Sequence, residues 1–308
     1  MHSKLILGTA MWGWTMPKER CFKLLDAYYQ LGGREVDTAT NYPINKKPQD
    51  FRQAETILRN WLTANGVKDM KVMMKIGSLN NLRTPDHNLT PSFLMMAASD
   101  YQSFFGRNLS TLMIHWDNRN QSIDIEKSLE VLSNLQKEGL NIGFSGLKHP
   151  QLYAEALKTT HLDTFQIQIK HNLLYSDYDR YQPLQDKASF IAYGINAGGL
   201  KLQQTAYKRN ASLTARGGKK ETHLDLIKVL NELLQKQQKT TSLPMPKRMN
   251  HLGLLYALYH PAIEQVLLGV SSIEQLEDTY QWVEQLDKVN YTDLYDDLDK
   301  LVAHNAKK

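Results

Sequence analysis

Four side chains within the first 115 residues have the types needed to move a proton to and from an oxygen atom. They are Asp37, Tyr42, Lys75 and His115. A tyrosine is a poor acid near neutrality, because its ordinary pKa is about 10. A neighbouring lysine ammonium, held by an aspartate, would lower that pKa by stabilising the phenolate. Tyr42 could then donate a proton to a developing alkoxide, and His115 could give the same oxygen a second hydrogen bond.

None of these four residues can supply the electron pair that a reduction needs, so a cofactor must supply it. A second interpretation makes Lys75 the nucleophile of a Schiff-base aldolase. The presence of Asp37, Tyr42 and His115 beside Lys75 favours the first interpretation.

The elements that must position these residues are predicted by a rhythm in the sequence, in which short β-branched runs alternate with helical patterns. The predicted strands are Leu5–Thr9, Glu35–Thr38, Val72–Ile76, Thr111–His115, Ile142–Ser145, Thr164–Gln168, Phe190–Tyr193 and Gln265–Gly269. The predicted helices are Phe51–Ala64, Ser92–Phe105, Ile125–Lys137, Gln151–Leu157, His223–Gln237, Met249–Tyr259, Ile273–Leu286 and Leu294–His304. Eight alternating units predict a parallel (β/α)8 TIM barrel that forms a single domain over residues 1–308.

A doubly wound sheet is the alternative, but it usually carries G-x-G-x-x-G after its first strand, and this chain reads Gly8-Thr9-Ala10-Met11-Trp12-Gly13 there. The predicted strands also end in polar residues, which are Asp37, Lys75, His115, Ser145, Gln168 and Tyr193. One polar residue at the end of a strand is ordinary, but six in succession indicate a site at the C-terminal mouth of a barrel, where such enzymes carry their chemistry.

Composition excludes several classes of function. The chain has 37 basic and 32 acidic residues, a net charge of +5, which is too weak to indicate nucleic-acid binding. No stretch approaches the ~20 apolar residues of a membrane helix, and the first residues show no signal-peptide pattern. The single cysteine, Cys21, cannot form an internal disulfide. A reducing cytoplasm fits this single cysteine best, and we expect no nucleic-acid or membrane partner. We also expect no metal, because no histidine pair has the spacing of metal ligands.

Several motifs resemble those of the aldo-keto reductase superfamily. They are Asp37-Thr38-Ala39 followed by Tyr42, Met74-Lys75-Ile76-Gly77, and Leu112-Met113-Ile114-His115-Trp116. The likeness begins at Leu7-Gly8-Thr9-Ala10 and ends near Leu276. It implies a catalytic tetrad of Asp37, Tyr42, Lys75 and His115, with hydride passing between a nicotinamide and a carbonyl carbon. Some proteins of this resemblance, the potassium-channel β-subunits, keep the cofactor and serve as channel partners, so a non-catalytic cofactor-binding protein is an alternative.

The resemblance also implies positions for a cofactor, with NADP(H) expected and NAD(H) left open. Ser145 and Gln168 would hold the nicotinamide carboxamide, and Tyr193 would stack on the ring. The remaining cofactor candidates are Thr9, the pyrophosphate turn Gly198, Gly199 and Leu200, and the adenosine-phosphate segment with Gly269, Ser271 and Gln275. Some positions depart from the family pattern. Gly146 stands where an asparagine is common, Gln275 where a basic residue is frequent and Thr279 where an asparagine is frequent, and Ile169-Lys170-His171 replaces a common Glu-Tyr.

The substrate is expected to be an aldehyde, a ketone or a ketosugar. Trp12 and Trp116 could form flat apolar walls of its pocket. Lys46 and Lys47, together with the basic segment Lys201–Thr222, would attract an anionic substrate such as a phosphorylated or nucleotide-linked ketosugar. The alternative is that these cations hold cofactor phosphates or are simply solvated. The oligomeric state is left open.

Overall fold

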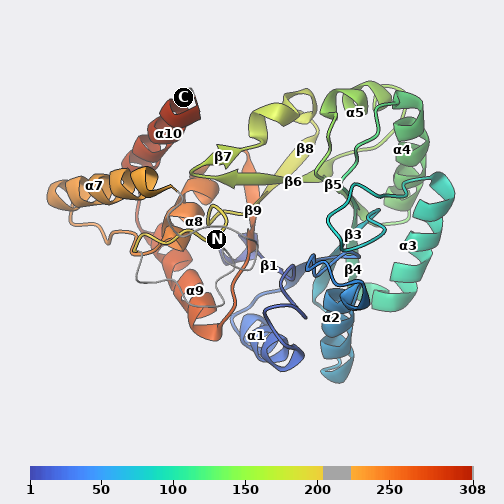
Figure 1. Cartoon of the computed structure of the whole chain (residues 1–308), viewed down its shortest axis with the longest axis horizontal. Coiled ribbons are helices and arrows are strands. Elements are labelled where there is room, and N and C mark those ends of the chain that lie inside the picture. Colours follow the sequence, from blue (N-terminus) through green and yellow to red (C-terminus); the bar gives the residue numbers. More distant parts are fainter. Residues whose placement is uncertain (204–222, 307–308) are drawn as a thin grey trace.

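A closed barrel of eight parallel strands forms the centre of the computed structural model, which describes residues 1–203 and 223–306 (Figure 1). The barrel strands are β1 (Leu5–Gly8), β2 (Glu35–Ala39), β3 (Lys71–Ile76), β4 (Leu109–His115), β5 (Asn141–Ser145), β6 (Phe165–Asn172), β8 (Ala188–Tyr193) and β9 (Ile263–Leu268). Each strand pairs with the next, and β9 pairs with β1 to close the ring. The (β/α)8 TIM barrel predicted from the sequence is confirmed. That residues 1–308 form one domain stays a prediction.

Helices surround the strands, with α3 and α4 side by side on one flank and α8 and α9 on another (Figure 1). The helices of the described residues are α1 (Lys18–Gln30), α2 (Gln53–Ala64), α3 (Pro91–Phe105), α4 (Ser122–Lys137), α5 (Pro150–Ala156), α7 (Leu224–Thr240), α8 (Met249–Tyr259), α9 (Ile273–Lys288) and α10 (Thr292–Ala306). None of these helices is long and apolar enough to cross a membrane.

The structure differs from the expected elements at two places. The sequence analysis missed α1, although Cys21, Leu24, Leu25 and Tyr28 are buried on one face at helical spacing. After β6, which extends four residues beyond its predicted end, a short antiparallel strand β7 (Tyr175–Ser176) and a 3-10 helix, η4 (Tyr178–Leu184), precede β8. The extension forms because β6 pairs with β8 as far as Lys170 and then with β7.

The interior of the barrel is filled by Ile6, Met73, Met113 and Ile191, which come from β1, β3, β4 and β8 and are fully buried. Gly143 on β5 leaves room for this filling, since a Cβ there would lie 2.3 Å from Met113 Cε. A second, larger cluster of buried side chains packs the helices onto the outside of the strands. The two layers hold the strand ends, and therefore the mouth, in fixed positions.

We expect Met113→Ala to lower the free energy of unfolding by about 2–5 kcal/mol, because it opens a cavity in the barrel interior. The matched control is Met96→Ala on α3, whose side chain is 67% exposed, and a surface change of this kind is worth about 0.5 kcal/mol or less. Urea denaturation of the two variants measures both values. Equal midpoints for both variants would contradict the packing described for the interior.

Candidate active site

A buried ion pair lies at the mouth of the barrel between Asp37 of β2 and Lys75 of β3. Lys75 Nζ donates to Asp37 Oδ2, and Gln168 Nε2 donates to Asp37 Oδ1 at 2.6 Å. Burial alone would lower the pKa of the Lys75 ammonium, but attraction to Asp37 and Tyr42 outweighs it, and the pKa is raised. Lys75 is therefore a fixed positive charge near neutrality.

Tyr42 is held beside this charge by the backbone of the loop after β2. Lys75 Nζ lies 5.1 Å from the centroid of the Tyr42 ring. Tyr42 N donates to Ala39 O at 3.1 Å, and its carbonyl accepts from Ala54 N at the start of α2. The His115 ring, at the end of β4, meets the Tyr42 ring edge-on at a centroid distance of 5.9 Å. The structure thus brings the four predicted catalytic side chains together from three adjacent strands.

His115 is an uncharged imidazole in this setting. Burial, and secondarily repulsion from Lys75, hold its pKa well below the ordinary value. Its Nδ1 is buried and has no hydrogen-bond partner within the described residues. A neutral ring carries one N–H, which can be donated to an oxygen without placing a second positive charge beside Lys75.

The residues predicted to hold the nicotinamide lie in one row across the barrel. The strand register places His115 opposite Ser145 and Ser145 opposite Gln168. Thr9 Oγ1 at the same end is buried without a hydrogen-bond partner in the described part of the chain, as is His115 Nδ1. Buried orphan donors and acceptors of this kind fit a polar group that enters the mouth. The structure also gives Gln168 a contact that the sequence did not reveal, its bond to Asp37.

The predicted pyrophosphate turn adopts a run of left-handed residues. Ala197, Gly198 and Gly199 have φ angles of 47°, 78° and 101°, which glycine adopts at little cost. The N–H groups of Gly199 and Leu200 both donate to Asn196 O, so these two amides are engaged within the turn. Their role toward a phosphate stays a prediction. Tyr193, at the end of β8, is half-buried near Tyr42, and its stacking role also stays a prediction.

The predicted adenosine-phosphate segment forms the N-terminal cap of α9. Ser272 Oγ accepts from Gln275 N, and Gln275 Oε1 in turn accepts from Ser271 N and Oγ. This arrangement resembles the S-x-x-Q capping box, except that the glutamine accepts from Ser271, the residue before the N-cap, and it explains a glutamine at this position. Sequence reasoning missed a cation here: Arg20 of α1 donates from Nη2 to Ser271 O at 2.6 Å. Finding Arg20 required the helix α1 to be recognised.

The tryptophans differ in what they offer a substrate. Trp116 has a left-handed backbone, with φ of 62°, and its ring lies 4.7 Å from the His115 ring. A Cβ at Gly146 would lie 2.4 Å from Trp116 Cδ1, so the indole occupies the space of the side chain that this position lacks. Trp12 is completely buried, and contact with a substrate would require it to move. Both assignments to the substrate pocket stay predictions.

Lys46 and Lys47 are exposed on the loop after β2. Asn81, from the loop after β3, anchors this loop by donating to Pro43 O and Lys47 O. The role of these lysines in selecting an anionic substrate stays a prediction. Most of the basic segment Lys201–Thr222 falls on residues 204–222, which lie outside the described residues.

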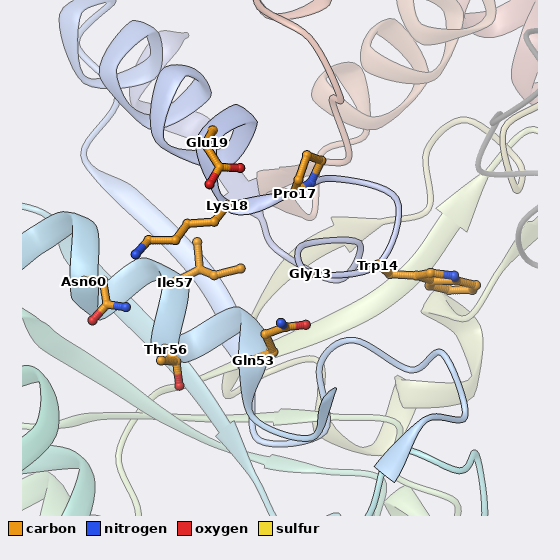
Figure 2. Close-up of a pocket in the computed structure, with 9 residues that line it drawn as sticks. All are labelled: Gly13, Trp14, Pro17, Lys18, Glu19, Gln53, Thr56, Ile57 and Asn60. Atoms are coloured by element: carbon orange, nitrogen blue, oxygen red, sulfur yellow. The ribbon is translucent and has the colours of Figure 1, made fainter. Parts of the chain in front are cut away.

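A cavity of about 490 Å³ opens between α1 and α2, and none of the tetrad residues lines it (Figure 2). Lys18 extends from the start of α1 toward Asn60 of α2, while Gln53 and Ile57 face the turn at Gly13. The cavity is thus lined by α1, α2 and the loop between β1 and α1. Across the described ranges, no group of three or more His, Cys, Asp or Glu residues could hold a metal ion.

Comparison with known proteins identifies the family and supports the fold. A model of the Aldo/keto reductase family matches residues 4–296. The chain belongs to the aldo/keto reductase family. A solved aldo-keto reductase from Bacillus halodurans, in its holo form, is similar with a TM-score of 0.70 at 21% identity, over 97% of this chain and 91% of that one. This likeness shows the fold.

Two curated relatives match over shorter stretches. A putative aryl-alcohol dehydrogenase of Saccharomyces cerevisiae is 37% identical over 78 residues, which are 23% of this chain and 34% of the relative. An aryl-alcohol dehydrogenase (NADP(+)) of Phanerodontia chrysosporium is 42% identical over 59 residues, which are 19% and 14% of the two chains. The matches therefore span about a third or less of these relatives.

For this family member we expect His115 to stay neutral at the pH where an ordinary histidine takes up a proton, because its pKa is held well below the ordinary value. An ordinary histidine titrates near pH 6.5. Below that pH the unfolded chain therefore binds a proton at this position, whereas the folded site stays neutral. His115 therefore lowers stability as the pH falls below about 6.5. NMR of ring-labelled histidine measures its titration, with His115→Gln to assign the signal. A His115 resonance that titrates near pH 6.5 would contradict the description of the site.

Proposed function

We propose that this aldo/keto reductase family member is an oxidoreductase that interconverts a carbonyl and an alcohol with NADP(H), with Tyr42 as the proton donor. One observation carries the proposal: a buried, charged Lys75 and a neutral His115 both lie beside the Tyr42 ring. The arrangement favours moving a proton at one oxygen atom.

The residues of the chain would divide the work as follows. The nicotinamide, when bound, supplies the hydride. Lys75, held by Asp37, stabilises a phenolate on Tyr42 and so makes the hydroxyl a stronger acid. His115 orients the substrate oxygen by donating a hydrogen bond, which is strongest as negative charge develops. Gln168 fixes the second oxygen of Asp37 and so the direction of the ion pair.

The names of the two curated relatives support an alcohol or aldehyde with an aromatic group as one substrate class, and NADP(H) as the cofactor. Trp116, beside His115, offers an aromatic face for such a ring. An anionic ketosugar, favoured by Lys46 and Lys47, is a further substrate class within the same proposal. A cytoplasmic location is likewise proposed.

The Schiff-base alternative fits less well. A lysine that attacks a carbonyl must be neutral, and enzymes achieve this by lowering its pKa. The pKa of Lys75 is raised, and its Nζ is bound to Asp37. A non-catalytic cofactor-binding protein would need none of the tetrad chemistry, and turnover with a panel of carbonyls separates that alternative from the enzyme.

We expect Tyr42→Phe to reduce kcat by about 10²–10⁴-fold, because the variant lacks the acid that protonates the substrate oxygen. Cofactor affinity should stay the same, since the hydroxyl acts only at the reacting oxygen. Steady-state kinetics with aromatic aldehydes and a fluorescence titration with NADPH provide the two measurements. The matched control is Tyr175→Phe, which removes an exposed hydroxyl bonded to Asp177. If both variants turn over substrate as the wild type does, Tyr42 is not the acid.

Arg20 gives a test of cofactor preference. Because its guanidinium lies at the cap of α9, a charge-assisted bond to a 2′-phosphate would favour NADPH over NADH. We expect Arg20→Ala to weaken NADPH about fivefold to tenfold and NADH much less, with the difference shrinking as salt rises. Arg107→Ala, before β4 at the opposite end of the barrel, is the control. Equal losses for both cofactors would remove Arg20 from the 2′-phosphate assignment.

A further inference from the structure

A second buried carboxylate lies behind the loop that carries Tyr42. Glu55, in the first turn of α2, is 0% exposed. Its Oε1 accepts from Arg52 Nε at 2.6 Å, and Tyr101 OH on α3 donates to its two oxygens at 3.1 and 2.9 Å. A carboxylate in such a place is costly to bury unless its partners hold it. The reaction proposed above does not use Glu55 directly, which leaves its function to be explained.

The partners of Glu55 lead directly to the segment Thr40–Tyr42. Tyr101 OH lies 3.3 Å from Thr40 Oγ1, and Thr40 Oγ1 donates to Lys75 O at 3.1 Å. Arg52 N donates to Thr40 O at 3.2 Å, and Ala54 N donates to Tyr42 O at 3.3 Å. The same short stretch of backbone that places the Tyr42 ring beside the Lys75 ammonium is therefore tied to Glu55 on two sides.

Arg52 is the strained member of this group. Its φ is 67°, a left-handed conformation that a residue with a long side chain adopts only when its surroundings compensate the cost. The ion pair with Glu55 and the bond from Arg52 N to Thr40 O provide that compensation. The Arg52 side chain is 45% exposed. Without the charge on Glu55, the guanidinium is held less firmly in its present position, and the left-handed conformation of Arg52 loses the interaction that stabilises it.

We propose that Glu55, acting through Arg52 and Tyr101, is a positioning residue that holds Tyr42 against Lys75. The inference rests on the function proposed above, because it concerns the placement of the proposed proton donor. It adds a residue on a surrounding helix to the groups that govern the reaction.

Because Glu55 is buried, its positioning of Tyr42 depends on pH. Burial raises the pKa of Glu55 to about 7, against the opposing pull of Arg52 and Tyr101. The pKa of Tyr101 is raised, first by burial and then by Glu55, so it stays a donor. Arg59, the other cation on this part of α2, has its guanidinium over the Phe104 ring, and the Lys75 ammonium is directed to Asp37. Arg52 is therefore the cation that pairs with Glu55.

The consequence is that kcat decreases as the pH falls through neutrality. Below a pH of about 7, Glu55 becomes neutral and its attraction for Arg52 weakens. Tyr42 is then held less firmly beside Lys75. The pKa of His115 lies well below this range and that of Lys75 lies above it, so neither of them produces this decrease. A reacting group misplaced by about 1 Å can cost up to ~10²-fold in rate.

The test uses Glu55→Gln, which keeps the shape and removes the charge, and Tyr101→Phe as a second variant should the first fold poorly. The control is Asp26→Ala, which removes the exposed carboxylate that accepts from Trp61 Nε1 of α2. Hydrogen–deuterium exchange of the amides of Thr40, Arg52 and Ala54 reports on the segment without any need for turnover. We expect about tenfold faster exchange at these amides in Glu55→Gln and Tyr101→Phe, and wild-type rates there in the control.

Kinetics complete the test. The wild-type kcat should fall below pH of about 7. In Glu55→Gln, kcat at pH 8 should be about 10- to 100-fold lower and show no step near neutrality, while KM for the cofactor is unchanged. Wild-type exchange, or faster exchange with a wild-type kcat profile, would overturn the proposal. If the wild type itself reduces no carbonyl, the proposed function fails, and the exchange rates alone decide whether Glu55 positions the segment.

Discussion

The structure depends on keeping an ion pair out of water at the mouth of an apolar barrel. Burying Lys75 and Asp37 costs free energy that only close pairing and further hydrogen bonds can offset. Both oxygens of Asp37 are therefore engaged, one by Lys75 and the other by Gln168 from the far side of the ring. β2 and β3 are neighbours, whereas β6 lies on the far side of the ring, so Gln168 can reach Asp37 only when the barrel is closed. Closure of the sheet thus completes the hydrogen bonds that hold the charged site.

The loops around the mouth are bonded to one another as well as within themselves. Asn81, from the loop after β3, donates to carbonyls of the loop after β2, and Arg83 Nε donates to Ile44 O in the same loop. The guanidinium of Arg83 also lies over the Trp14 ring, in the loop after β1. Three successive loops therefore form one connected rim. Side chains of the loop after β3 make these links to backbone carbonyls and to an indole ring of the other two loops.

Much of the fold and of the tetrad could be predicted from the sequence, because the relevant signals are local. Alternating runs gave the eight strands, and polar residues at the strand ends gave Asp37, Lys75 and His115. The contacts of Gln168 with Asp37 and of Arg20 with Ser271 could not be predicted, since they join residues 131 and 251 positions apart. The helix α1 was detectable in principle, because Cys21, Leu24, Leu25 and Tyr28 share one face.

The filling of the barrel has a consequence for oxidation chemistry. Two pairs of methionines differ in exposure: Met73 and Met113 are buried in the barrel interior, while Met95 and Met96 are exposed on α3. Thioethers become sulfoxides where peroxide can reach them. The outer pair would take up oxygen first and leave the site untouched, since α3 presents them to solvent. The inner pair would react only in molecules whose barrel has opened, and a sulfoxide there would leave a polar group that the apolar interior could not accept again. A sulfoxide at Met73 or Met113 would thus identify a molecule whose barrel has opened.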